Sequence, residues 1–117
     1  MLLATTATLP GYELRVGLGP VSGTGVRAAK WSNAGLALLH EELSREALQP
    51  LLQVAAARGA NAVVGLHYVL TILGGSGGGT MVIAYGTAAW AAPVTPEAVS
   101  QYEAMLQAGQ LPTAAPR

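Results

Sequence analysis

The N-terminal part of the chain has the two-residue period of β-strands. Residues 2–10 are rich in Thr, and Pro10-Gly11 closes them with a turn, which predicts a short strand. Along residues 12–29, Leu14, Val16 and Leu18 alternate with charged neighbours, which predicts a second strand. Its glycines and Pro20 predict bends or a bulge within that strand.

A helical period follows over residues 35–58. Apolar residues recur at intervals of three and four, which predicts an amphipathic helix; they include Leu36, Leu39, Leu43, Ala47 and Leu51. Pro50 lies inside this pattern and has no N–H to donate, so we expect a kink or two helical pieces. Gly59 is well placed to end the helix in a left-handed conformation.

Two β-branched segments, residues 61–73 and 80–91, then flank the sequence GGSGGG. This arrangement predicts an antiparallel hairpin with a loose glycine tip. Strict alternation would place Val64, Leu66, Tyr68, Leu70 and Ile72 on one face, and Val63, Gly65, His67, Val69, Thr71 and Leu73 on the other. Neither face is properly polar, so we expect the helix to cover one and a neighbouring subunit to cover the other.

The C-terminal segment predicts a second, short helix. Thr95 is a suitable N-cap, Pro96 suits the first helical position, and Gly109 suits the terminator. The expected fold is therefore α+β, with a two-layer β-α-β-β subunit in which an antiparallel sheet packs on one kinked helix. We expect residues 1–92 to form this domain, and residues 93–117 to form the C-terminal helix and a disordered tail.

Charge is scarce in this sequence. Residues 59–96 contain no Lys, Arg, Asp or Glu, and charged residues make up 10% of the chain against about 25% in a typical soluble domain. A small monomer normally solvates its surface with charge, so we expect the chain to bury surface against copies of itself. The net charge of zero argues against a nucleic-acid or anionic-membrane binder. The chain has no cysteine, which excludes disulfides, thiolate zinc sites and thiol catalysis.

The glycine-rich and histidine-containing motifs do not match known catalytic signatures. In GLGPVSG, Ser22 replaces the third glycine of a dinucleotide fingerprint, and GGSGGGT lacks the Gly-Lys-Ser/Thr of a P-loop. HEELS has Ser44 where a metalloprotease helix needs a second His, so His40 is interpreted as part of a solvated helix face. The N-terminus does not resemble a signal peptide, and no apolar run is long enough for a spanning helix, so we expect a cytoplasmic protein.

A few side chains remain as candidates for binding. His67 lies in the middle of a predicted strand, either as a half-buried interface residue or as one ligand or base per subunit around an oligomer axis. Tyr68 and Tyr85 are the further candidates for a ligand or metal site shared between subunits. The candidates for the oligomer interface are Trp31, Val69, Thr71 and Trp90.

The order of the motifs resembles the YbjQ-like family, which is labelled as heavy-metal-binding. The resemblance covers roughly residues 4–91 and rests on Thr5-Thr6, Pro10-Gly11-Tyr12-Glu13, Val21-Ser22-Gly23, the helix residues around Ala47-Leu48, GANAVVG (59–65) and AYGTAAW (84–90). It implies a dodecin-like subunit that assembles into a ring, usually a pentamer, with no established reaction. Where the family carries polar residues this chain reads LHYVLT and TMVI, so fewer metal ligands are available.

We therefore expect a non-enzymatic, homo-oligomeric ring protein, with itself as partner and without nucleic acid or membrane. The first alternative is a metal- or small-ligand-binding protein with a shared site near His67, in which a divalent metal is the candidate cofactor. An enzyme with an active site between subunits and a membrane-active oligomer are the remaining alternatives. The C-terminal helix lies outside the resemblance and is interpreted as an added docking element.

Overall fold

The computed structural model describes the backbone of residues 1–27, 33–73 and 79–112, and their side chains except at 27, 33–40 and 73. The fold is α+β, with four strands and two helices: β1 (Leu2–Leu3), β2 (Tyr12–Arg27), α1 (Asn33–Ala57), β3 (Ala62–Leu73), β4 (Gly79–Pro93) and α2 (Pro96–Gln107). The helix, the hairpin and the C-terminal helix expected from the sequence are all present. The hairpin tip, residues 74–78, lies outside the described residues.

The strands form a single sheet in the order β1-β3-β4-β2. β4 pairs antiparallel with both β3 and β2, as the hairpin pattern predicts, whereas β1 pairs parallel with β3 over two residues. The sheet is therefore mixed rather than purely antiparallel. Irregular pairing in β2 between Leu14 and Val16, and between Gly17 and Pro20, confirms the bulges expected from its glycines and proline.

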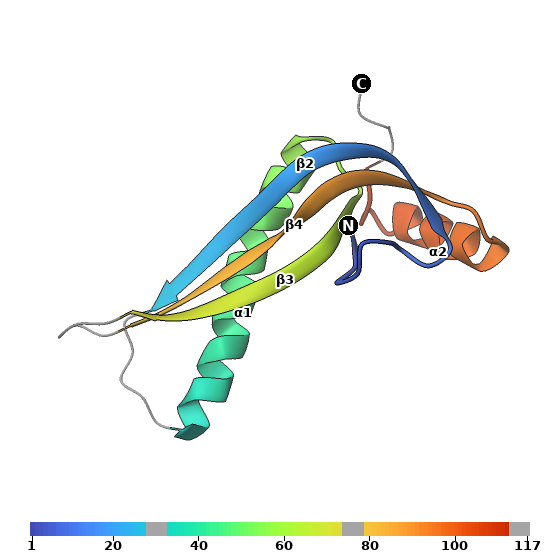
Figure 1. Ribbon diagram of the computed structural model, residues 1–117. Coiled ribbons are helices and arrows are strands. Elements are labelled where there is room, and N and C mark those ends of the chain that lie inside the picture. The colour runs from blue at the N-terminus through green and yellow to red at the C-terminus, as the bar shows by residue number, and fades with distance from the viewer. Residues whose placement is uncertain (28–32, 74–78, 113–117) are drawn as a thin grey trace.

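The outer halves of β2, β3 and β4 form a narrow three-stranded extension of the sheet away from α2, and α1 covers part of one of its faces (Figure 1). We call this extension the arm and define it as residues 22–26, 66–72 and 80–85. The radius of gyration is 16.6 Å, against about 13 Å for a compact domain of this length. The molecule is therefore elongated, and the arm has more surface than a compact shape would leave exposed.

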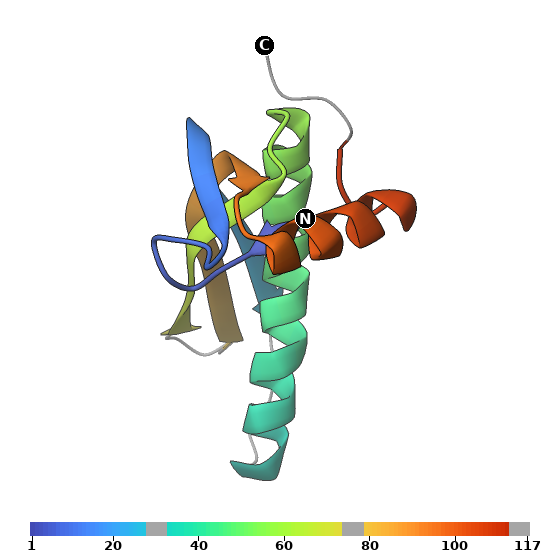
Figure 2. The same ribbon diagram turned by 90° about the vertical axis from the view of Figure 1, so that its right-hand side faces the viewer.

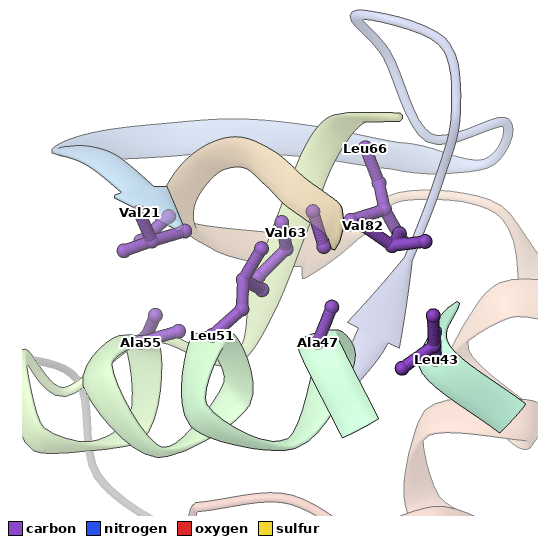
Figure 3. Packing of buried hydrophobic residues seen from close by; sticks show 11 residues of the cluster. Val21, Leu43, Ala47, Leu51, Ala55, Val63, Leu66 and Val82 are labelled. Carbon is purple, nitrogen blue, oxygen red and sulfur yellow. The ribbon is translucent and has the colours of Figure 1, made fainter. Parts of the chain in front are cut away.

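One face of the sheet packs on α1, which runs alongside it (Figure 2). The helix buries one residue per turn, namely Leu43, Ala47, Leu51 and Ala55. These side chains point toward Val21, Val63 and Val82 of the three long strands (Figure 3). The main core of the protein lies between these two layers.

Two glycines let α1 approach β2 at backbone distance. A Cβ atom at Gly25 would lie 2.7 Å from the carbonyl oxygen of Leu43, and one at Gly23 would collide with the carbonyl oxygen of Ala47. The same Gly23 position lies 3.0 Å from Cγ of Pro50, so the proline ring also faces this strand. The glycines of the VSGTG segment are thus required by helix–strand packing rather than by a nucleotide.

The helix α1 is continuous through Pro50, so the prediction of two helical pieces is wrong. The helix ends as expected at Gly59, which has a φ of +80°. The Gly59 N–H donates to Ala56 O, and the Ala60 N–H donates to Ala55 O, both at 3.0 Å. These two bonds form a Schellman motif, which satisfies the last carbonyls of the helix.

A β-bulge at Gly65 changes the faces of β3. Val64 pairs with Thr87 and His67 pairs with Tyr85, so two residues of β3 lie opposite Gly86 alone. Gly65 has a φ of +62°, which side chains rarely adopt. Val63 and Leu66 consequently share the core against α1, and the uninterrupted alternation predicted from the sequence is wrong at this point.

A smaller cluster holds the C-terminal helix against the base of the sheet. Tyr102, Met105 and Leu106 of α2 pack against buried residues that include Ala62, Val64 and Ala91. The predicted cap is confirmed, because Thr95 Oγ1 accepts a hydrogen bond from the Ala98 N–H at 3.2 Å and Pro96 opens the helix. In the part of the chain that the structure describes, no helix is long and apolar enough to cross a bilayer.

Candidate functional site

His67 and Tyr85 lie side by side on the face of the sheet that α1 does not cover. They are directly paired across β3 and β4, and their rings meet edge to face with centroids 3.8 Å apart at an interplanar angle of 68°. The two rings are therefore in direct contact, closer than the roughly 4.5–7 Å between the centroids of most aromatic pairs. The register shift at Gly65 makes this pairing possible, because it moves His67 opposite Tyr85.

The imidazole of His67 is oriented by its own strand. Its Nδ1 lies 2.8 Å from the carbonyl oxygen of Gly65. Because a carbonyl oxygen only accepts hydrogen bonds, this contact places a proton on Nδ1 and leaves Nε2 as the free ring nitrogen. His67 is exposed, so in a single chain Nε2 is accessible to a ligand.

The third ligand candidate, Tyr68, does not join this pair. It follows His67 directly, and strand alternation turns its side chain to the face on which α1 packs. α1 lies mainly over β2 and β4, so Tyr68 stays 36% exposed. The structure therefore brings together two of the three predicted ligand residues and separates Tyr68 from them.

The interface candidates lie at different ends of the sheet. Val69 and Thr71 continue the face of His67 along the arm, where Val69 is 39% exposed and Thr71 is partly buried. Trp90 is partly buried and pairs with Val16 near the base, away from the arm. Trp31 lies outside the described residues.

The described residues of one chain do not fit a metal centre. They contain no group of three His, Cys, Asp or Glu side chains that could hold a metal ion. The neighbours of His67 on its face are a phenol, a valine and an isoleucine, which are poor ligands for heavy metals. Among the described residues, His67 would therefore supply a single imidazole ligand to a metal site on this face.

Two hollows lie elsewhere on the molecule. One of about 560 Å³ is lined by residues that include Gly11, Thr95 and Gln101. The other, of about 400 Å³, lies between α1 and the C-terminal segment, and its lining includes Leu52, Ala56 and Pro112. Neither of these two hollows is lined by His67, Tyr68 or Tyr85.

Asn61 is fully buried, and it was not among the candidate residues predicted from the sequence. Its Nδ2 donates to Ala91 O at 2.8 Å and to Tyr102 Oη at 2.9 Å, and its Oδ1 accepts from the Ala91 N–H at 2.7 Å. The side chain thus joins β4 and α2 at the base of the sheet. A polar residue inside the otherwise apolar motif GANAVVG was the available signal, because such a residue needs buried partners.

Three comparisons relate the chain to known proteins. Residues 34–92 match the model of the YbjQ_1 family, whose description is "Putative heavy-metal-binding". A UPF0145 protein of Mycobacteroides abscessus is 35% identical, with 80% of this chain and 99% of that protein covered. A UPF0145 protein of Acidothermus cellulolyticus is 36% identical, with 76% and 94% covered.

A solved structure has the same fold. The crystal structure of a protein with unknown function from Pediococcus pentosaceus, assigned to the DUF74 family, superposes with a TM-score of 0.63 at 22% identity. The superposition covers 77% of this chain and 96% of that one. The family match spans α1, the hairpin and the AYGTA segment, whereas β2 lies before it in the chain. The chain therefore belongs to the YbjQ-like family, also named UPF0145, as the order of its motifs indicates.

Proposed function

We propose that this chain is a non-enzymatic protein that acts as a homo-oligomer, in which neighbouring copies cover the arm. The observation that carries the proposal is the exposure of apolar side chains on both faces of the arm. Tyr68, Leu70 and Ile72 are exposed on the face of α1, and Val26 and Val69 on the opposite face.

Exposing these apolar side chains to water is energetically unfavourable. Ile72 is 66% exposed, and the arm contains no charged residue on any of its three strands. Several apolar side chains exposed within one segment of a sheet are typical of a protein interaction site. Burying apolar area contributes about 25 cal/mol per Å², so each apolar side chain that a neighbouring copy covers would favour association.

A ring of copies is the assembly that we favour, with five subunits as the YbjQ-like resemblance implies. A non-enzymatic role is supported by the small number of titratable side chains, namely six Lys or Arg, six Asp or Glu and two His in 117 residues. Some of them pair on the surface, such as Arg45 with Glu41 at 2.7 Å and Arg15 with Glu13 at 3.6 Å.

Substitution in the arm tests the proposal. Ile72→Lys introduces a charge into the surface that we expect to be buried between copies, so sedimentation velocity should show a smaller particle than the wild type. Val94→Lys is the matched control, because Val94 is 55% exposed but lies outside the arm. Unchanged sedimentation of both variants would contradict the proposal that copies cover the arm.

A specific observation favours a second candidate, which is ligand binding at His67. The hydrogen bond from Nδ1 to Gly65 O orients the ring in the way that second-shell carbonyls orient metal-binding histidines. In an oligomer, several such Nε2 atoms could converge on one divalent cation. Equilibrium dialysis with Zn²⁺ against the wild type and His67→Ala tests this candidate. Equal binding by both proteins would exclude His67 as a ligand.

A further inference from the structure

Among the described residues, the outer edge of β3 is paired only at its base. There the N–H groups of Gly65 and Leu66 donate to Thr6 O and Ala4 O, at 2.8 and 3.0 Å. Since backbone groups alternate in direction along a strand, the N–H and C=O groups that face outward beyond Leu66 belong to Tyr68, Leu70 and Ile72. β1 reaches only Ala62 and Val63, so no described strand pairs with this part of β3.

The outer edge of β2, at the other side of the sheet, is also occupied near its base, in this case by an arginine side chain. Nη1 of Arg58 donates to Pro20 O at 2.6 Å and to Leu18 O at 3.2 Å, and Pro20 itself has no N–H. Alternation from Pro20 then directs the backbone groups of Ser22, Thr24 and Val26 outward. β2 is the last strand in the order of the sheet, so no described strand pairs with them either.

The two free stretches lie at the same height of the sheet. β4 lies between them and defines their relative register. Thr24 and Val69 both pair with Ile83, and the neighbouring residues of β2 and β3 likewise share partners on β4. Each stretch offers three outward-facing residues. The free stretches are therefore matched in length and position on opposite edges of one arm.

The direction of the strands also matches. β2 and β3 both run antiparallel to β4, so they run parallel to each other. In parallel pairing a residue with outward groups lies opposite one with inward groups. Leu70 would then lie opposite Gly23 or Gly25 of a second copy, and Val69 opposite Ser22 or Thr24. Each of these pairs has its side chains on the same face of the sheet, so both faces would continue across the junction.

We propose that β3 of one copy pairs in parallel with β2 of the next copy, along residues 68–72 and 22–26. This inference rests on the proposed homo-oligomer and names the surface through which it forms. The two edges are different surfaces, so the contact is head-to-tail and generates a closed ring when the rotation between copies allows closure. Unpaired edges are a hazard for sheet proteins, and this contact would satisfy both edges of the arm.

Engineered cysteines test the contact, because the natural chain contains none. Within one chain, residues 24 and 69 are separated by β4 and lie about 10 Å apart, twice the strand spacing. A disulfide needs Cα atoms within about 7 Å, so a Thr24→Cys/Val69→Cys protein cannot form it internally. Any disulfide in that protein links two copies.

Mild oxidation of the purified double variant should give a ladder of covalent multimers on a non-reducing gel. Ser22→Cys/Val69→Cys and Val26→Cys/Val69→Cys cover the neighbouring registers, and at least one of the three should form the ladder. The single variants Thr24→Cys and Val69→Cys should stay monomeric on the gel. A covalent dimer from Val69→Cys alone would overturn the proposal, because it would indicate two-fold pairing of β3 with itself.

A proline variant provides an independent test. Leu70→Pro removes an outward N–H at an edge position, where proline is tolerated, and should reduce the mass measured by light scattering to that of one chain. Leu70→Ala keeps the N–H and should retain the assembly better.

If the wild type is assembled but the ladder is absent from all three double variants, the edge contact is wrong and the homo-oligomer stands. If the wild type is a monomer, the proposed function itself fails.

Discussion

The side chain of Asn61 pairs with the backbone of Ala91 as a neighbouring strand would, donating to its carbonyl at 2.8 Å and accepting from its N–H at 2.7 Å. These two bonds occupy both polar groups of a buried residue at the base of β4. A third bond, to Tyr102 Oη, adds α2 to the same arrangement. One amide therefore joins the hairpin to the C-terminal helix.

Asn61→Ala should lower the free energy of unfolding by about 2–3 kcal/mol, because it leaves buried backbone groups of Ala91 without partners. Urea denaturation followed by circular dichroism measures this change. Tyr102→Phe removes one hydrogen bond and should cost only about 1 kcal/mol. A loss for Asn61→Ala no larger than that for Tyr102→Phe would contradict the role of Asn61 in holding β4.

Gly23→Ala should destabilise the protein by about 3 kcal/mol or more, because the added Cβ collides with the backbone of α1 at Ala47 and lies 2.9 Å from Leu51 N. The helix would have to move away from β2. Gly17→Ala is the matched control on the same strand, since no described atom beyond its two chain neighbours lies within 4 Å of its Cβ position. Thermal unfolding of the two variants should therefore differ clearly, and similar midpoints would contradict the close approach of α1.

Stability should fall in alkaline solution as Tyr12 ionises. Burial, and then the charge of Tyr102, raise the pKa of Tyr12 above its ordinary value of 10.0. The folded state thus keeps the phenol proton more strongly than the unfolded state does. This contribution is complete below pH 10.0 and is lost as the pH rises through the folded pKa.

Tyr12→Phe removes that proton and should make the decline above pH 10 shallower in urea titrations at successive pH values. The substitution also removes the hydrogen bonds of Tyr12 Oη to Gln101 and Ala98, at 3.2 and 3.4 Å. The decline of each protein is therefore measured relative to its own free energy of unfolding at neutral pH. An identical alkaline slope in both proteins would contradict the assignment to Tyr12.

Local signals in the sequence were sufficient for much of the fold. Gly59 and Thr95 mark helix ends through backbone conformation and capping, which depend on a few neighbouring residues. The hairpin follows from two β-branched runs around a glycine tip. Pro50 left a kink and two helical pieces open, and the structure excludes only the second, because α1 is one helix that packs closely on β2 at Gly23.

Features that depend on distant residues were not predictable. The bulge at Gly65 inverts the alternation of β3, and only the pairing with β4 shows that Gly65 is the residue with positive φ. The geometry of the candidate site also depends on residues that are distant in the sequence. His67 and Tyr85 were both identified as candidates, but their contact depends on this register. The separation of Tyr68 from His67 follows from strand alternation alone and was predictable. The partners of Asn61 are 30 and 41 residues away in the chain.

Covering of the arm by further copies is the central claim, and the mass of the wild-type particle tests it most directly. Multi-angle light scattering over a dilution series into the micromolar range measures that mass without any substitution. We predict a stable integer multiple of the 11.8 kDa chain, with five copies giving about 59 kDa. A particle of 11.8 kDa at every concentration would contradict the account.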